Sequence, residues 1–172
     1  LLDRFYRYSC EVILVNKGVF SRRCRQKLMV ARRPEWNRIA GLSEVEPESM
    51  SRFTPVERTV DMDTIDAMIA EHGMPVERIS YVNLTVNGAE FEALKGMGRL
   101  LRRAKRMCVT VAAGRCETGR EGRGIGSIEG RPDHVVISEF LAAFGFRTRF
   151  RRFGPDTFGY VIGLKGPDRW LL

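Results

Sequence analysis

The sequence has few of the residues that build metal sites and disulfide frameworks. It contains two histidines and four cysteines in 172 residues. The cysteines lie at positions 10, 24, 108 and 116, a spacing that excludes a Cys-x-x-Cys zinc site and a disulfide-stapled scaffold. We therefore predict reduced thiols. His72 and His134 fall in separate predicted helices, where we expect surface or capping roles and no metal site.

Long hydrophobic runs are also missing. No segment approaches the roughly 18 consecutive apolar residues that a membrane span requires. The first residues, Leu1 to Arg4, become charged too early for a signal peptide. We therefore expect a cytoplasmic protein. Because the chain begins at Leu1 rather than at methionine, we also expect that further sequence precedes it.

Basic residues outnumber acidic ones, 29 against 21, so the net charge is +8. The excess lies in short runs at residues 22–25, 102–106 and 147–152. Such runs can bind phosphates, but these carry no RNA-binding aromatic signature and no zinc-finger spacing. The pattern favours a solvated basic surface over nucleic-acid binding. A non-catalytic basic domain that binds anionic partners is the alternative function.

The length and composition predict one domain over residues 1–172 with an alternation of strands and helices. A chain of this size buries roughly 70% of its unfolded surface. The predicted strands are residues 11–16, 27–31, 79–86, 107–113, 146–153 and 158–165, and the predicted helices are residues 61–73, 89–103 and 135–144. This order predicts an α/β fold with a parallel sheet, closed by an antiparallel pair formed by the last two strands.

Two features refine this outline. Asp63 or Thr64 is suited to cap the helix at 61–73, and Gly73 is suited to end it. Residues 32–59 carry three prolines and little periodicity, which predicts a loop anchored by Trp36 and Ile39. The Gly-x-Gly-x-Gly run at residues 122–126 lies about ten residues after the preceding strand, so it predicts a flexible loop rather than a phosphate cradle.

Residues 80–96 place polar side chains around a sharp strand-to-helix turn at Asn87 and Gly88. Ligands of open α/β sheets bind outside the carboxyl ends of the strands. This rule places three groups along one edge of the sheet, each after a different predicted strand: Asn16 and Lys17, residues 85–87, and residues 113–115. Asn83 shares one face of its strand with Thr85.

The residues of the strand-to-helix turn also have a purely structural interpretation. Asn87 and Gly88 form a turn in that interpretation, and Glu90 complements the positive end of the following helix. Thr85 then supplies a buried hydroxyl that bonds to a neighbouring backbone group.

Residues 64–73 (TIDAMIAEHG) and 88–96 (GAEFEALKG) resemble the FkbM family of S-adenosylmethionine-dependent methyltransferases. Weaker likenesses lie at residues 14–19 (LVNKGV), 138–141 (SEFL) and 145–148 (GFRT). The resemblance implies a class I methyltransferase fold, which is a Rossmann-like, mostly parallel sheet of seven strands with an antiparallel strand at its end. It implies that the cofactor is S-adenosylmethionine. It also implies that the methyl group is transferred to a hydroxyl oxygen of a small molecule, a sugar or a lipid.

Combined with the placement of residues along the sheet edge, the resemblance assigns roles to seven residues. The catalytic residues are Thr85, Asn87 and Glu90. The cofactor-binding residues are Asn16, Lys17, Asn83 and Gly88.

The sequence departs from the family pattern in two ways. The glycine-rich turn after the first strand and the acidic residue after the second have no counterpart, so the chain looks like the C-terminal part of the domain without its first two strands. The family block Lys-Ile-Asp-Val-Glu-Gly-Ala-Glu is replaced by residues 83–90 (NLTVNGAE), in which Asn83, Thr85 and Asn87 are neutral. This predicts a variant uncharged site, or a degenerate domain retained for assembly. Alone, the chain is expected to bind the cofactor weakly or not at all.

Overall fold

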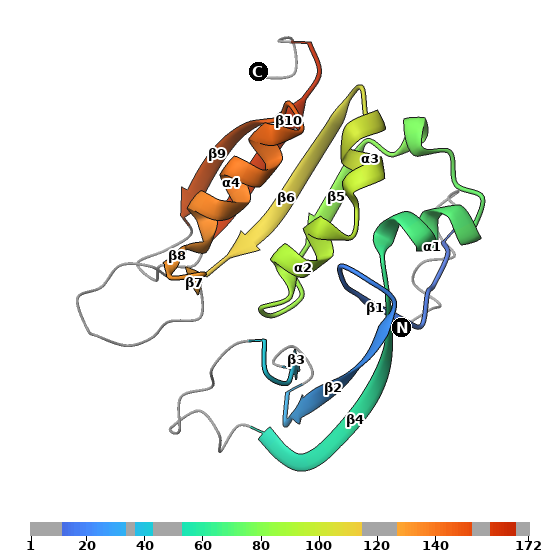
Figure 1. Ribbon diagram of the computed structural model, residues 1–172, viewed down its shortest axis with the longest axis vertical. Coiled ribbons are helices and arrows are strands. Elements are labelled where there is room, and N and C mark those ends of the chain that lie inside the picture. Colours follow the sequence, from blue (N-terminus) through green and yellow to red (C-terminus); the bar gives the residue numbers. More distant parts are fainter. Residues whose placement is uncertain (1–11, 34–36, 43–52, 115–126, 153–158, 168–172) are drawn as a thin grey trace.

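The computed structural model describes residues 12–33, 37–42, 53–114, 127–152 and 159–167, which form two four-stranded sheets and a short third ribbon (Figure 1). The first sheet has the order β1-β4-β2-β3, with β1 at Gly18–Val19, β2 at Cys24–Ala31, β3 at Arg38–Ile39 and β4 at Phe53–Asp63. The second has the order β5-β6-β10-β9, with β5 at Tyr81–Leu84, β6 at Met107–Ala113, β9 at Arg147–Arg152 and β10 at Gly159–Lys165. The ribbon pairs β7 (Ser127–Ile128) with β8 (Arg131–Pro132).

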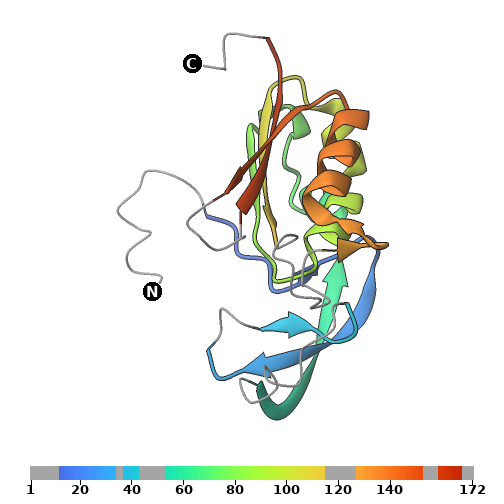
Figure 2. The ribbon, with the colours of Figure 1, turned by 90° about the vertical axis from the view of Figure 1, so that its left-hand side faces the viewer.

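The helices are α1 (Ile65–Glu71), a 3-10 turn at Val76–Arg78, α2 (Glu90–Lys95), α3 (Gly98–Arg103) and α4 (Asp133–Ala143). In Figure 2, α2, α3 and α4 lie on one side of the second sheet. Alternation along β6 explains this arrangement, because Val109 and Val111 are fully buried whereas Cys108 and Thr110 are partly exposed. The main core therefore lies between the second sheet and its helices, where Leu94, Leu101 and Leu141 are fully buried.

The α/β class is confirmed, but the expectation of a mostly parallel sheet is wrong for the described residues. Only β1 with β4 and β5 with β6 pair in parallel there, and the remaining described pairs are antiparallel. The predicted antiparallel pair at the C-terminal end is confirmed as β9 and β10. Both four-stranded sheets contribute to the antiparallel excess, because β2 pairs with β3 and β4 in the first and β10 pairs with β6 and β9 in the second.

The predicted strand at 11–16 is wrong over its described part, residues 12–16. These residues have no strand partner in the described structure, and Val12, Ile13 and Leu14 are exposed. A β-rich apolar run forms a strand only where another strand supplies its hydrogen bonds. Regular pairing begins only at β1, where Gly18 lies opposite Met62 of β4.

The predicted loop at 32–59 is wrong over residues 53–59. Residues 53–63 form β4. The strand therefore includes residues 61–63, which were predicted to begin the helix, and α1 starts at Ile65. The long antiparallel pairing with β2 explains the strand, since partners so far apart in sequence leave no local periodicity. Ile39 is buried, as expected of an anchor, whereas Trp36 and the glycines at 122–126 lie outside the described residues.

Local signals predicted the N-terminal cap of α1 and the glycine that follows it correctly. The Thr64 hydroxyl accepts a hydrogen bond from the Ala67 amide at 3.0 Å, and Gly73 has a φ of +62°. Asp66 of α1 also caps α3, because its carboxylate accepts hydrogen bonds from Arg99 and Leu100 amides at 2.7 and 2.9 Å. One acidic side chain thus joins two helices.

The single helix predicted at 89–103 is divided into α2 and α3 at Gly96 and Met97. The Gly96 carbonyl accepts a hydrogen bond from the Asp66 amide at 3.0 Å. The backbone of Gly96 also lies against the Phe20 carbonyl, so closely that a Cβ built on it would be 2.1 Å from that oxygen. The break therefore follows from a contact that only glycine permits.

The last helix and the last two strands agree with prediction. Phe146 is buried, and Phe150 packs on the core cluster, whereas Arg147, Arg149 and Arg151 are exposed. This alternation confirms the expected division of β9 into an apolar and a basic face.

Candidate functional site

The turn that follows β5 is held by the carboxylate of Glu90, the first residue of α2. One Glu90 oxygen accepts a hydrogen bond from the Val86 amide at 2.9 Å, and the other accepts one from the Gly88 amide at 2.8 Å. Bonds from amides to an ionised acceptor are among the stronger hydrogen bonds of a protein. Glu90 therefore fixes the backbone of the turn with both of its oxygens.

Asn87 lies within this turn in a left-handed conformation, with φ of 52°, and Gly88 follows with φ of 98°. The Asn87 side-chain amide donates a hydrogen bond to the Asn37 carbonyl at 2.9 Å. Asparagine adopts this backbone region more readily than most residues, and glycine does so without steric cost. Asn87 thus links the end of the second sheet to the segment that enters β3 of the first.

A second carboxylate lies at the end of the neighbouring strand β6. Asp133 is 8% exposed, and its oxygens accept hydrogen bonds from the Gly114 amide at 2.7 Å and from the His134 amide at 2.6 Å. Burial raises the pKa of Asp133 to about 6, and the nearby charge of Glu90 acts in the same direction. The two hydrogen bonds oppose this rise in pKa. The carboxyl ends of two parallel strands are thus each tied by one acidic side chain.

We expect Asp133 to make the protein less stable as the pH rises. Its folded pKa of about 6 exceeds the ordinary value of 3.8, so its contribution is greatest in acid and is lost as the pH rises through about 6. Between about pH 4.5 and 7.5 the loss is about 2 kcal/mol. Urea unfolding of the protein and of Asp133→Asn should show that difference in pH dependence. Parallel pH profiles would contradict it.

Asn83 lies on the face of β5 that points away from the helices, and Thr85 directly follows the strand. Both are exposed, whereas Leu84 between them is buried. Asn83 accepts a hydrogen bond from the Thr110 hydroxyl at 2.7 Å, and that hydroxyl also lies 3.0 Å from the Tyr81 hydroxyl. The interpretation of Thr85 as a buried hydroxyl is therefore wrong, and its exposed side chain is accessible to a ligand.

Asn16 and Lys17 lie on a different segment, ahead of β1. Lys17 pairs with Glu71 of α1 at 2.6 Å and with Asp63 at 3.6 Å, and Asp63 also accepts two hydrogen bonds from Arg23 at 2.7 and 3.0 Å. The Arg23 guanidinium lowers the pKa of the buried Asp63 carboxyl despite the opposing effect of burial. The Glu71 carboxylate raises the pKa of Lys17. Lys17 is thus committed to ion pairs that join the first sheet to α1.

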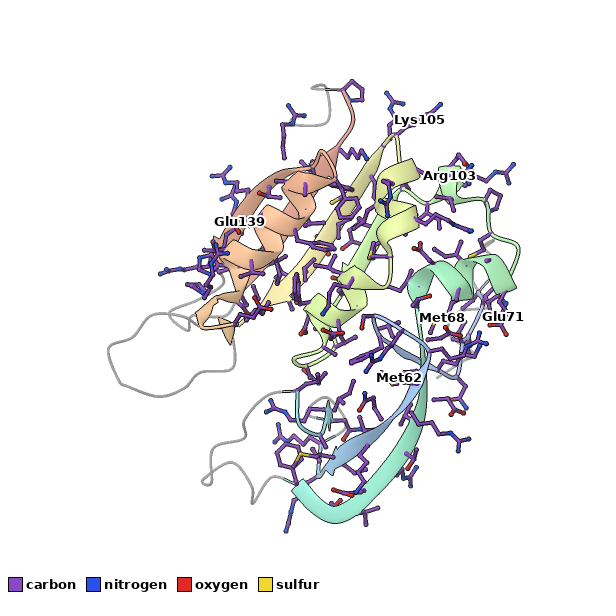
Figure 3. The ribbon with its side chains drawn as sticks, in the orientation of Figure 1. Met62, Met68, Glu71, Arg103, Lys105 and Glu139 are labelled. Atoms are coloured by element: carbon purple, nitrogen blue, oxygen red, sulfur yellow. The ribbon has the colours of Figure 1, made fainter. Side chains whose placement is uncertain are left out.

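Met62, which is labelled with Glu71 in Figure 3, lines two cavities. One, of about 510 Å³, is surrounded by Lys17 and the charged groups described above. The other, of about 230 Å³, lies between the first sheet and the turn after β5, and its lining includes Val86 and Asn87. The structure therefore groups Asn87, Gly88 and Glu90 in one turn, and it places Lys17 at a separate, charged cavity.

Sequence reasoning missed Asp133 and Asn37. Asp133 follows a proline at the start of a helix, and this position alone indicates only a helix end. Its partner Gly114 lies 19 residues earlier, and the partner of Asn37 lies 50 residues later. Within the described ranges no three His, Cys, Asp or Glu side chains converge on a metal position, and no helix there is long and apolar enough to cross a membrane.

Comparison with known proteins identifies no relative of this chain. The chain matches no family model, no curated protein and no solved structure. Its functional interpretation therefore depends on the geometry of its own residues and on the resemblance carried by residues 64–73 and 88–96.

Proposed function

We propose that the chain is part of an S-adenosylmethionine-dependent methyltransferase domain of the FkbM type that methylates a hydroxyl of a small molecule. One observation supports this best. The segment with the strongest resemblance forms a fixed polar turn at the carboxyl end of β5, next to the parallel strand β6. Open α/β sheets bind their ligands at this edge.

The strand order of the second sheet is compatible with the proposal. Two parallel strands are followed by an antiparallel pair, with β10 inserted between β6 and β9. This arrangement suits the C-terminal half of a class I methyltransferase sheet. In the proposal, the cofactor contacts that the glycine-rich turn and the acidic residue normally make come from sequence that precedes this chain.

Methyl transfer from a sulfonium is an in-line displacement, so the protein mainly positions donor and acceptor and accepts a proton where needed. Both oxygens of Glu90 bind backbone amides, which makes it a positioning residue in this proposal. Asp133, with a pKa of about 6, is better matched to accept a proton near neutral pH. Thr85 and Asn83 are the exposed polar groups that contact the ligands.

Calorimetry of S-adenosylmethionine with the complete gene product tests the proposal. We expect saturable binding that is weakened at least about tenfold by Asn87→Ala, since that residue holds the turn against β3. Arg149→Ala on β9, the strand at the far edge of the sheet, is the matched control and should bind normally. Absence of binding by the complete protein would overturn the proposal, whereas weak binding by the 172-residue chain alone is expected.

A second candidate is supported by β9, which lies at one edge of the second sheet. Arg147, Arg149 and Arg151 are exposed on one face of this strand, opposite the partly buried Phe150. A row of guanidinium groups attracts an anionic partner, and the attraction weakens with salt. In this interpretation the domain is a non-catalytic binding module.

Retention on immobilised nucleic acid distinguishes the second candidate from the first. If the basic face binds, retention falls steeply with salt and is lost when all three arginines of β9 are changed to alanine. Triple replacement of Arg99, Arg102 and Arg103, which are also basic but lie on α3, is the control and should leave retention nearly unchanged. Retention that is indifferent to salt would exclude this function.

A further inference from the structure

The smaller cavity is a half-open pocket between the first sheet and the segment that follows β5 of the second. Its walls come from β1, β2, β3, β4 and the turn after β5, and they include Val19, Leu28, Ile39, Val60, Met62, Val86 and Ala89. Ile39, Met62 and Ala89 also belong to a second hydrophobic cluster, together with Phe20. The cavity is therefore a space within an apolar contact between the sheets, and Asn87 forms part of its boundary.

The polar side chains of the lining are nearly all neutral. Gln26, Asn37 and Asn87 carry amides, and the lining residues that the structure describes include no carboxylate. Among the described lining residues Lys27 is the one with a charge, but its side chain is 69% exposed and pairs with Glu57 at 3.0 Å. An ion in this half-open pocket would lose part of its hydration without gaining a counter-charge from the described lining. The lining therefore selects a neutral ligand.

The volume restricts the ligand further. A cavity of about 150 Å³ accommodates benzene, so about 230 Å³ accommodates one six-membered ring with small substituents. S-adenosylmethionine is too large and too highly charged for this space. A sugar ring would bury its hydroxyls against apolar walls without enough partners. The ligand that fits these restrictions is a compact apolar group with one polar atom directed at the side-chain amides of the lining.

We propose that this cavity holds the apolar part of the methyl acceptor, and that the acceptor is a neutral alcohol or phenol with a single small ring or a short branched alkyl group. This inference rests on the proposed methyltransferase function. Asn87 connects the cavity to the proposed methyltransferase site, because it forms part of the turn after β5 and also lines the cavity. The ring lies among Val60, Met62 and Val86, and the hydroxyl points to the turn.

Titration of the 172-residue chain with 4-methylphenol, followed by amide NMR shifts, tests the cavity without the cofactor. We expect saturable binding with a dissociation constant on the order of 1 mM, and shifts at Met62, Val86 and Ala89. The anion 4-hydroxybenzoate, which has the same ring, should bind at least about tenfold more weakly. Equal binding of the two compounds, or no saturable binding of 4-methylphenol, would overturn the proposal.

Val60→Phe should fill the cavity and weaken 4-methylphenol binding at least about tenfold. Val56→Phe is the matched control, since Val56 lies on the same strand but is 51% exposed, and it should bind normally. If Val60→Phe does not fold, Val60→Ala replaces it, and the enlarged cavity should then bind 2-naphthol. Unchanged binding by Val60→Phe, or exclusion of 2-naphthol by Val60→Ala, would contradict the assignment.

The two proposals fail in different experiments. Cofactor binding by the complete protein without 4-methylphenol binding would overturn the acceptor cavity and leave the methyltransferase proposal standing. Binding of 4-methylphenol without cofactor binding by the complete protein would overturn the role of the cavity as an acceptor site.

Discussion

Replacement of Gly96 by alanine is expected to destabilise the protein by about 4 kcal/mol, above the usual cost of overpacking. A Cβ at this position would lie 2.1 Å from the Phe20 carbonyl oxygen and 3.1 Å from its carbon. Both are backbone atoms, so no side-chain rotation relieves the contact. The substitution must instead separate α2 from the segment between β1 and β2, where Phe20 is buried and its amide donates to the Asp63 carbonyl at 2.9 Å.

Gly98 provides the matched control, two residues further along the chain. A Cβ there meets only the flexible end of Arg102, at 3.5 Å, so Gly98→Ala should change the free energy of unfolding by less than about 1 kcal/mol. Thermal and urea unfolding of both variants measure the difference. For a domain of this size the Gly96→Ala cost corresponds to a fall in the melting temperature of roughly 10 °C. A Gly96→Ala protein as stable as Gly98→Ala would contradict the close backbone contact.

Local patterns predicted the elements whose partners are near in sequence. Capping residues and apolar stripes predicted α1 and α4. A continuous apolar run predicted β6 with its observed ends. The errors occurred where a distant partner decides the conformation. β4 forms because β2 lies beside it, α2 ends where Phe20 meets Gly96, and residues 12–16 have no strand partner in the described structure.

The candidate site divides in the same way. Asn87, Gly88 and Glu90 lie together because they belong to one turn whose conformation is encoded within a few residues. Asp133 lies at the site only because the fold brings the start of α4 to the end of β6, where its carboxylate binds the Gly114 amide. The expected proximity of Lys17 to Asn87 depended on a strand at 11–16, and without that strand Lys17 pairs with Glu71 instead.

The charges around the turn are coupled. Glu90 raises the pKa of Asp133, in addition to the larger effect of burial. Burial lowers the pKa of Arg38 on β3, and the Glu90 charge opposes that effect. One carboxylate therefore interacts with groups from both sheets while it holds the turn. Loss of the Glu90 charge is consequently expected to lower the pKa of Asp133 as well as to release the turn.

Glu90→Ala should destabilise the protein by about 3 kcal/mol, since it removes two hydrogen bonds to a charged acceptor and leaves the part-buried Val86 amide without that partner. Glu77→Ala is the control, because Glu77 and its partner Arg103 are both more than half exposed and their pair contributes at most about 1 kcal/mol. Urea unfolding gives the two free energies. Amide hydrogen exchange locates the effect, with protection expected to fall at Val86 and Gly88 in Glu90→Ala alone. Equal destabilisation by the two variants would show that Glu90 does not hold the turn, and the proposed site would lose the residue that shapes it.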